Sequence, residues 1–357
     1  TYEKIIRNLV SFSFKNRNSK EKVRRKSMKN MKTAAGMLCL AGILSLGMGT
    51  TVFAEDGDSH YPVTITTYNY ENEPVEMTFE KAPEKVFAYA NSNVEELLAL
   101  GLGDKIVAAC GLDGDVREDL KDEFDKIQYM DTKPSKEEVV AMEPDFIAAW
   151  YSSFSDDWLS DVSFWQERDV NTYMSLNSSA KGPASEFPRT IEDEYEDILN
   201  LGKIFDCEDK AEEIVDQMKG EIDKVKEHVE GTDPLSVAVL EDEGDSFRVY
   251  GTETLGGNIP ETLGAELKLG AENSENVGAE DLIAADPDVL FMINYDGFMT
   301  ADEAIADITD NPAYASLSAV KNNKVFSVNL NEVYCSGVRT YDGIMTFAKA
   351  LYPDLYE

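Results

Sequence analysis

EEVVAMEPDFI, at residues 137–147, returns as EDLIAADPDVL at residues 280–290, a constant offset of 143 positions. Each copy has acidic residues where a helix would begin, an apolar helix face, a Pro-Asp break and a short apolar run. Proline ends a helix, and a short apolar run after it is typical of a buried strand. Each copy therefore predicts one helix-to-strand unit, and the chain is predicted to hold two similar α/β lobes.

The sequence before the first copy alternates strands and helices in the same way. Short apolar runs predict strands at residues 86–89, 106–109 and 146–150, and helical spacing from Asn93 to Leu100 stops at Gly101. Strands separated by helices predict mainly parallel sheets covered by helices on both faces. The expected fold class is α/β, with two Rossmann-like lobes.

A long amphipathic helix is predicted between the two copies. Apolar residues recur at steps of three and four from Ala211 to Val229, and charged residues occupy the other face. About twenty residues would span about 30 Å, enough to join two lobes with only small movements between them. An ordinary covering helix is the alternative. The predicted division is an N-terminal lobe over 55–206, an inter-lobe helix over 207–232 and a C-terminal lobe over 233–357.

The first 54 residues are predicted to lie outside the folded protein. Residues 1–27 look like upstream translated sequence, and a basic segment and the apolar run 34–49 then precede Val52-Phe53-Ala54, a small-x-small cleavage pattern. This order is typical of a signal peptide, and the run is too short and Gly-rich for a membrane span. We expect an exported protein cleaved near Ala54. Cys39 is a poor match to a lipoprotein cleavage site, and a lipid anchor remains the alternative.

Composition excludes several classes of partner and site. The chain has 33 Lys and Arg against 69 Asp and Glu, a formal net charge of −36, which disfavours nucleic acids and anionic membranes as partners. The two histidines, His60 and His228, are too few for a bare zinc or manganese site built on several imidazoles. Cys110, Cys207 and Cys335 lack the spacing of a disulfide framework or a thiolate zinc site. No cofactor and no bound metal ion are expected.

Five segments in order along the chain resemble a known family. They are a first-helix signature at 93–107, the helix and Pro-Asp strand at 137–149, a lead-in to a connecting helix at 190–204, an Asn-Pro signature at 311–326, and Gly337-Val338-Arg339. Together they resemble the class III solute-binding proteins, the siderophore, haem and cobalamin binders of ABC importers, from about residue 83 to Pro353. Val338 stands where that family usually has Pro, and residues 180–188 form an insertion.

The resemblance implies a monomer that holds a small-molecule ligand between two lobes and docks on an importer permease through one exposed glutamate per lobe. Glu95 matches the first of these positions, and Glu261 matches the second less closely. Charge-assisted pairs between these carboxylates and permease arginines would contribute orientation and association rate more than affinity.

Aromatic residues dominate the loops where a ligand is expected. In open α/β sheets ligands bind beyond the carboxyl ends of the strands. Flat rings with polar tips suit a large planar or macrocyclic chelate, although ordinary packing also explains any single ring. Arg339 suits either a ligand oxygen or a surface ion pair. The predicted ligand-binding residues are Tyr89, Asn91, Trp150, Tyr151, Tyr250, Asn294, Tyr295, Tyr334 and Arg339.

The predicted ligand is a metal chelate. Basic residues are sparse in these loops, which favours an iron-siderophore of the near-neutral hydroxamate type over a triply anionic catecholate. Cobalamin and haem are alternatives, haem through a tyrosinate of Tyr89 or Tyr151. A peptide or sugar binder on a similar scaffold is a further alternative. An exported hydrolase is the rival from another class, but the chain has no Gly-x-Ser-x-Gly, His-Glu-x-x-His or P-loop motif. We therefore expect a binding protein rather than an enzyme.

Overall fold

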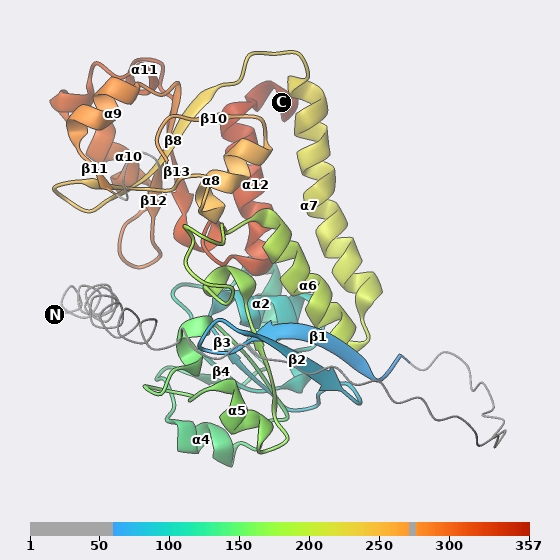
Figure 1. Cartoon of the computed structure of the whole chain (residues 1–357). Helices are drawn as coiled ribbons and strands as arrows, with labels where there is room; N and C mark the ends of the chain where they lie inside the picture. The colour runs from blue at the N-terminus through green and yellow to red at the C-terminus, as the bar shows by residue number, and fades with distance from the viewer. Residues whose placement is uncertain (1–59, 271–275) are drawn as a thin grey trace, which may run out of the picture. The chain divides into compact units, whose positions relative to one another are not determined.

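The computed structural model describes residues 60–270 and 276–357 (Figure 1). The predicted leader, its cleavage position near Ala54 and Cys39 lie outside the described residues. From Asp58 to Glu357 the chain forms one compact unit. Among the residues described, no helix combines the length and apolar character that crossing a bilayer requires.

The first sheet consists of five parallel strands in the order β5-β4-β3-β6-β7. The predicted strands at 86–89, 106–109 and 146–150 are confirmed to within one residue as β3, β4 and β6. An antiparallel hairpin of β1 and β2 precedes this sheet in the chain. The strand bounds are β1 Val63–Tyr68, β2 Pro74–Phe79, β3 Val86–Tyr89, β4 Ile106–Cys110, β5 Tyr129–Met130, β6 Phe146–Ala149 and β7 Asn171–Met174.

The second sheet has the order β11-β9-β8-β12-β13, with β10 paired to β8. Strand β8 runs parallel to β10 and β12, and β12 runs parallel to β13, while β9 is antiparallel to β8 and β11. We call the part of the protein built on the first sheet the N-lobe and the part built on the second sheet the C-lobe. The strand bounds are β8 Ser236–Asp242, β9 Phe247–Val249, β10 Glu266–Leu267, β11 Asn276–Val277, β12 Val289–Asn294 and β13 Val325–Asn329.

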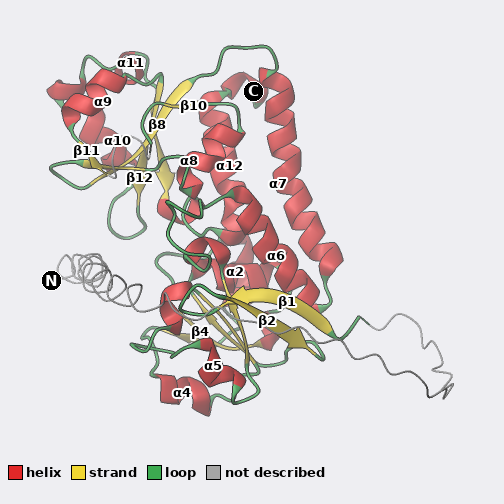
Figure 2. Ribbon diagram, in the orientation of Figure 1, coloured by secondary structure: helices red, strands yellow, loops and turns green. Residues whose placement is uncertain are grey.

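Helices flank the strands of both sheets (Figure 2). Alternation along β8 shows how the C-lobe sheet is covered, because successive side chains of a strand point to opposite faces. Val239 packs in one apolar cluster with residues of α8 and α12, whereas Leu240 packs in another with residues of α9, α10 and α11. The helix bounds are α2 Asn91–Ala99, α3 Lys121–Phe124, α4 Lys136–Ala141, α5 Val162–Gln166, α6 Ile191–Phe205, α7 Glu208–Val229, α8 Leu255–Thr262, α9 Ala279–Ala285, α10 Ala301–Thr309, α11 Ser318–Lys321 and α12 Thr340–Leu351.

The two copies of the repeated pattern fold alike. Helix α4 leads into β6 and α9 leads into β12, and each strand lies between two parallel neighbours. The aspartate after each proline accepts a hydrogen bond from the backbone where the neighbouring strand begins. Asp145 Oδ1 accepts from the N–H of Lys85 at 2.8 Å, and Asp288 Oδ2 accepts from the N–H of Ser236 at 3.0 Å. The Pro-Asp pair therefore both ends a helix and fixes the start of the adjacent strand.

Replacing Asp145 or Asp288 with alanine is expected to lower the free energy of unfolding by about 1–3 kcal/mol, because the backbone donors lose a charged acceptor. Urea unfolding of the two variants measures this loss. Asp104→Ala, at an exposed position, is the matched control and is expected to stay within about 0.5 kcal/mol of wild type. Equal losses in all three variants would contradict a structural role for the Pro-Asp pair.

Helix α7 is the long amphipathic helix that the sequence predicts. It has 22 residues, and its buried side chains are Ala211, Val215, Met218, Ile222 and Val225. Figure 1 shows it running beside α6 and α12, and contacts join it to both. The apolar stripe faces these neighbours, which satisfies the packing that an amphipathic helix requires.

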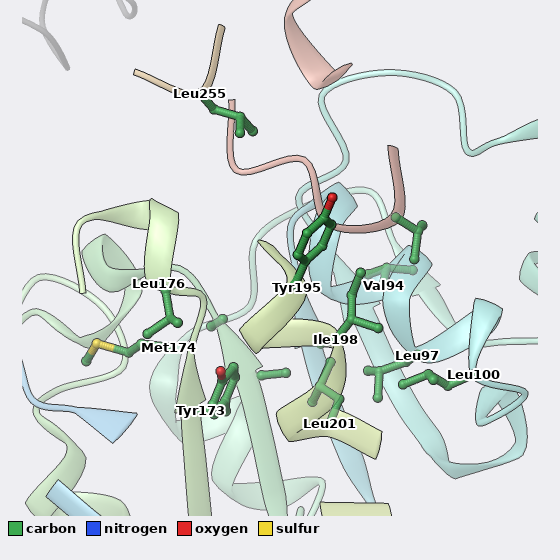
Figure 3. Close-up of a cluster of buried hydrophobic side chains, with 14 of the residues drawn as sticks. Val94, Leu97, Leu100, Tyr173, Met174, Leu176, Tyr195, Ile198, Leu201 and Leu255 are labelled. Atoms are coloured by element: carbon green, nitrogen blue, oxygen red, sulfur yellow. The ribbon is translucent and has the colours of Figure 1, made fainter. Parts of the chain in front are cut away.

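One hydrophobic core runs through both lobes. In its N-lobe part, Ile198 and Leu201 of α6 lie close to Leu97 of α2 (Figure 3). The same cluster includes Phe146 of β6 and Phe291 of β12, one from each sheet. The apolar faces of α6, α7 and α12 therefore belong to the core of both lobes rather than to a separate linker.

Candidate functional site

Three aromatic side chains form a row that joins the two lobes. Tyr89 ends β3, Trp150 follows β6, and Tyr334 lies in the segment after β13. Ring centroids are 6.3 Å apart between Tyr89 and Trp150 and 5.9 Å apart between Trp150 and Tyr334, both edge to face. Tyr334 is 39% exposed. The structure thus brings together three predicted ligand residues, and we call them the aromatic row.

A lysine lies over the N-lobe end of the aromatic row. Lys133 Nζ is 3.6 Å from the ring centroid of Trp158 and 5.6 Å from that of Tyr89. Ring faces attract cations through their quadrupole, and this position partly desolvates the ammonium and lowers the pKa of Lys133. Sequence reasoning missed Lys133 because it follows β5, a strand of two residues that carries too few residues for a periodic pattern.

The charges of two arginines, Arg248 and Arg189, act on Tyr334 at the C-lobe end of the row, and the Arg189 guanidinium itself donates to Ser179 Oγ and to the backbone oxygens of Phe187 and Gly182. Burial raises the pKa of Tyr334, and the charges of Arg248 and Arg189 oppose that rise. The Arg248 guanidinium lies 5.5 Å from the ring centroid of Tyr250, and its Nη1 lies 3.9 Å from Glu241 Oε2. Arg248 is inside β9, and Arg189 directly follows the insertion, so neither belongs to the loops that the strand-end rule selects. The prediction that the strand-end loops hold few basic residues therefore did not take account of cations on other elements.

Two of the predicted tyrosines have their hydroxyls engaged by one carboxylate. Tyr250 donates to Glu241 Oε2 at 2.8 Å, and Tyr295 donates to Glu241 Oε1. Burial, followed by the nearby charge of Glu241, raises the pKa of both phenols. Tyr250 is only 2% exposed, so it is a core residue that fixes Glu241 beside Arg248.

The remaining N-lobe predictions, Tyr151 and Asn91, have structural partners. Tyr151 stacks on Tyr70 and donates its hydroxyl to the backbone oxygen of Tyr70 at 2.9 Å. Asn91 Oδ1 accepts from the N–H of Asp113 at 2.7 Å, and its buried Nδ2 has no hydrogen-bond partner among the residues that the structure describes. In the C-lobe, Asn294 ends β12 and is half-buried. These three residues stay predicted ligand residues.

Arg339 and Glu95 form an ion pair between the lobes. Arg339 Nε and Nη2 donate to the two oxygens of Glu95, each at 2.7 Å, and Glu95 is fully buried. The expectation of an exposed Glu95 is therefore wrong: Arg339, which lies 244 positions away, covers its carboxylate. Arg339 is correspondingly held by Glu95 rather than directed at a ligand. Glu261, near the end of α8, is exposed.

Three buried carboxylates meet where α2, α6 and the C-lobe turn Gly337–Arg339 come together. Glu96, Glu194 and Asp197 each place an oxygen within 4.8 Å of the others. Glu194 accepts from the N–H of Gly337 at 2.6 Å and from that of Ser336 at 3.1 Å. Burial raises the pKa of Glu194 to about 7, and burial with mutual repulsion raises the pKa values of Glu96 and Asp197. No sequence motif indicated this cluster.

Two surface hollows lie outside the aromatic row. One, of about 420 Å³, is beside the Arg339–Glu95 pair and is lined by Arg117, Glu118, Asp119 and Asp342. The other, of about 390 Å³, lies between α6, α7 and α8.

Comparison with known proteins places this architecture in a family. A sequence profile described as Periplasmic binding protein matches residues 86–329. The ABC transporter substrate-binding lipoprotein YvrC of Bacillus subtilis is 24% identical over 339 residues, covering 92% of this chain and all of YvrC. The Fe(3+)-citrate-binding protein YfmC of Bacillus subtilis is 25% identical over 202 residues, covering 56% of this chain and 58% of YfmC.

A solved structure agrees with these sequence matches. A periplasmic binding protein from Veillonella parvula superposes with a TM-score of 0.77 at 33% identity, covering 83% of this chain and 93% of that chain. The profile spans the strands of both sheets and helix α7 between them, so the likeness includes both lobes. These are binding proteins of transport systems, not enzymes, which answers the rival hydrolase hypothesis. The chain belongs to the periplasmic binding protein family.

Proposed function

We propose that the protein binds an anionic ferric chelate, such as ferric citrate or a ferric siderophore, at the aromatic row and delivers it to an ABC importer. The observation that carries this proposal is the position of Lys133 over the N-lobe end of the aromatic row, and the positive charges of Arg189 and Arg248 that act on Tyr334 at the other end support it. Aromatic faces suit a flat chelate, and the cations suit its carboxylate or catecholate oxygens.

The negative charge of the whole chain makes the position of these cations important for an anionic ligand. The chain has a formal net charge of −36, so most of its surface repels an anion. A local group of cations within such a field gives an anionic ligand one favourable place to bind. A near-neutral hydroxamate or a cobalamin would gain little from it, so we propose an anionic chelate in place of the hydroxamate that the sequence suggested.

Haem binding through a tyrosinate is less favoured. Burial is the largest cause that raises the pKa of Tyr89 to about 12 and that of Tyr151 to about 12. Forming either tyrosinate would have to overcome this burial cost. The YfmC relative, named for Fe(3+)-citrate, points in the same direction as the cations.

Tryptophan fluorescence tests the proposal. Trp150 belongs to the aromatic row and Trp158 lies under Lys133, so a bound ferric chelate is expected to quench the emission saturably. Ferric citrate, a ferric catecholate, ferrioxamine, haem and cobalamin are titrated in parallel. We expect the two anionic chelates to bind, and Arg248→Gln to weaken that binding by about tenfold or more, because it removes a charge-assisted partner.

The control for the arginine variant is Arg168→Gln. Arg168 is an N-lobe arginine whose guanidinium lies 3.6 Å from the ring centroid of Phe164, outside the aromatic row. It should leave the affinity unchanged. Saturable binding of ferrioxamine or cobalamin without binding of either anionic chelate would overturn the proposed ligand class, and no response to any of the five would overturn binding at this row.

We further propose that the protein works outside the cytoplasm as a monomer and docks on a permease through Glu261. The signal-peptide pattern and the family support the location, and the exposure of Glu261 supports its role. The buried state of Glu95 means that the matching contact on the N-lobe needs a different acidic residue or a rearranged Arg339.

A further inference from the structure

We propose that His60, Asp206 and Glu208 form a binding site for one divalent transition-metal cation, of which Zn²⁺ is the test case. His60 Nδ1 lies 3.4 Å from Asp206 Oδ1 and 3.2 Å from Glu208 Oε1. These three ligand atoms all lie within 4.8 Å of one another. The site is separate from the aromatic row and from the ligand that we propose there.

A backbone carbonyl sets the orientation of the histidine. His60 Nε2 lies 2.7 Å from the carbonyl oxygen of Lys203, and because a carbonyl only accepts, Nε2 must carry the hydrogen. Nδ1, the other ring nitrogen, then faces two carboxylates, and a metal ion placed between these three ligand atoms would have a favourable environment. A metal-bound histidine commonly donates its other N–H to a backbone carbonyl in this way.

The distances fit a shared metal better than direct hydrogen bonds. Ligand atoms about 2.0–2.1 Å from a tetrahedral zinc are about 3.3 Å from each other, and the separations of Nδ1 from the two oxygens are 3.4 and 3.2 Å. A charge-assisted N–H···O bond would bring these atoms to about 2.7–2.9 Å. The spacing therefore leaves room for an ion between the histidine and the carboxylates.

Two of the ligands, Asp206 and Glu208, come from the junction between α6 and α7, and a hydrogen bond to Lys203 holds the third, His60, against it. The Lys203 and Ile204 carbonyls belong to the last turn of α6, where carbonyls have no partner within the helix, and they accept from His60 Nε2 and the Tyr61 hydroxyl. Asp206 follows α6 in the left-handed conformation, and Glu208 is the first residue of α7. The Asp206 side chain is 59% exposed, so an ion can enter from solvent. A bound ion would tie the segment that leads into β1 to the α6–α7 junction.

The donor set selects the class of metal. One imidazole nitrogen with two carboxylate oxygens suits Zn²⁺ and its first-row neighbours. Calcium and magnesium prefer six or more oxygen ligands and gain little from an imidazole. Zinc should therefore bind in preference to magnesium, which separates this site from general cation attraction to an acidic surface.

Calorimetric titration of the purified, chelator-treated protein with ZnCl₂ tests the site. One equivalent is expected to bind saturably and to raise the melting temperature, and an equal concentration of MgCl₂ should do neither. Asp206→Asn and Glu208→Gln leave the His60–Lys203 contact in place, and each should weaken zinc binding by about tenfold or more. Asparagine also tolerates the left-handed backbone at position 206.

The matched control is the other histidine. His228 Nε2 faces a single carboxylate, Asp354 Oδ2, at 3.4 Å, so His228→Ala should bind zinc like wild type while His60→Ala should not. Equal zinc binding by the two histidine variants would show general surface attraction and overturn the proposal. Absence of saturable zinc binding in the wild type would overturn it too.

Discussion

Arg339→Met is expected to lower the free energy of unfolding by about 3–5 kcal/mol, because it leaves the Glu95 carboxylate buried without its partner. Glu95 has no exposed surface, and Arg339 holds both of its oxygens at 2.7 Å. The N–H of Arg117 also donates to Glu95, at 2.9 Å, but one neutral backbone donor does not replace a guanidinium. Urea unfolding, followed by circular dichroism, measures the loss.

A double variant separates loss of the pair from loss of packing. Arg339→Met combined with Glu95→Leu removes both charges and should regain most of the lost stability, since apolar pairs of similar volume replace buried ion pairs well. Lys121→Met is the surface control: its partner Asp125 is exposed, and such pairs contribute about 1 kcal/mol or less. A single variant as stable as wild type, or a double variant no better than the single one, would contradict this account.

The carboxylate cluster of Glu96, Glu194 and Asp197 is expected to make the protein less stable as the pH rises. Burial raises the pKa of Glu194 from 4.5 to about 7, so the folded state holds a proton that the unfolded chain releases. The stabilisation is complete below about pH 4.5 and is lost as the pH rises through about 7, because the folded state then binds more protons than the unfolded state. For Glu194 alone, the difference is on the order of 3 kcal/mol.

Glu96→Gln tests this dependence. Burial is the largest cause of the raised pKa of Glu96, followed by the charges of Asp197, Glu194 and Glu95. An uncharged amide removes the repulsion, so the variant should be more stable than wild type by about 1–3 kcal/mol at pH 8. The gain should shrink toward zero near pH 4.5, where the wild-type cluster is protonated.

Urea unfolding of the wild type and of Glu96→Gln at several pH values between 4.5 and 8 gives this difference in stability directly. Because the other acidic residues titrate in both proteins, their contribution cancels in the difference. Glu137→Gln, an exposed substitution on α4, is the control and should follow wild type at every pH. A gain for Glu96→Gln that does not change with pH would show that packing, and not ionisation, is responsible.

Local patterns predicted the framework of the fold well. The apolar run at Val86–Tyr89, the stripe of α7 and the Pro-Asp repeat all carry their information within about twenty neighbouring residues, and all three form the expected elements. The aspartates of the repeat have a further role that the sequence did not indicate: Asp145 and Asp288 accept hydrogen bonds from the backbone where the neighbouring strand begins. The strand-end rule selected the aromatic row for the same reason, since it depends only on where strands end.

Contacts between distant residues were not predictable from such patterns. Glu95 looked like a surface charge because its neighbours in sequence do not reveal Arg339, its partner in the other lobe. Arg248 was missed because a cation inside a short strand gives no sign of which ring it faces. His60 looked isolated because both carboxylates near it lie across the chain, at the α6–α7 junction. In each of these three cases the prediction failed because it depended on a contact between residues far apart in the sequence, which a single sequence does not reveal.

The core that passes through α6, α7 and α12 into both sheets should resist movement of one lobe relative to the other. Any rotation of one lobe against the other would strip apolar side chains such as Phe291 and Ile198 of their neighbours, and each 100 Å² of apolar surface exposed costs about 2.5 kcal/mol. The free-energy cost therefore grows with the angle through which one lobe rotates against the other. We therefore expect ligand binding to change the angle between the lobes only slightly, and the bound and free forms to differ mainly in local surface features.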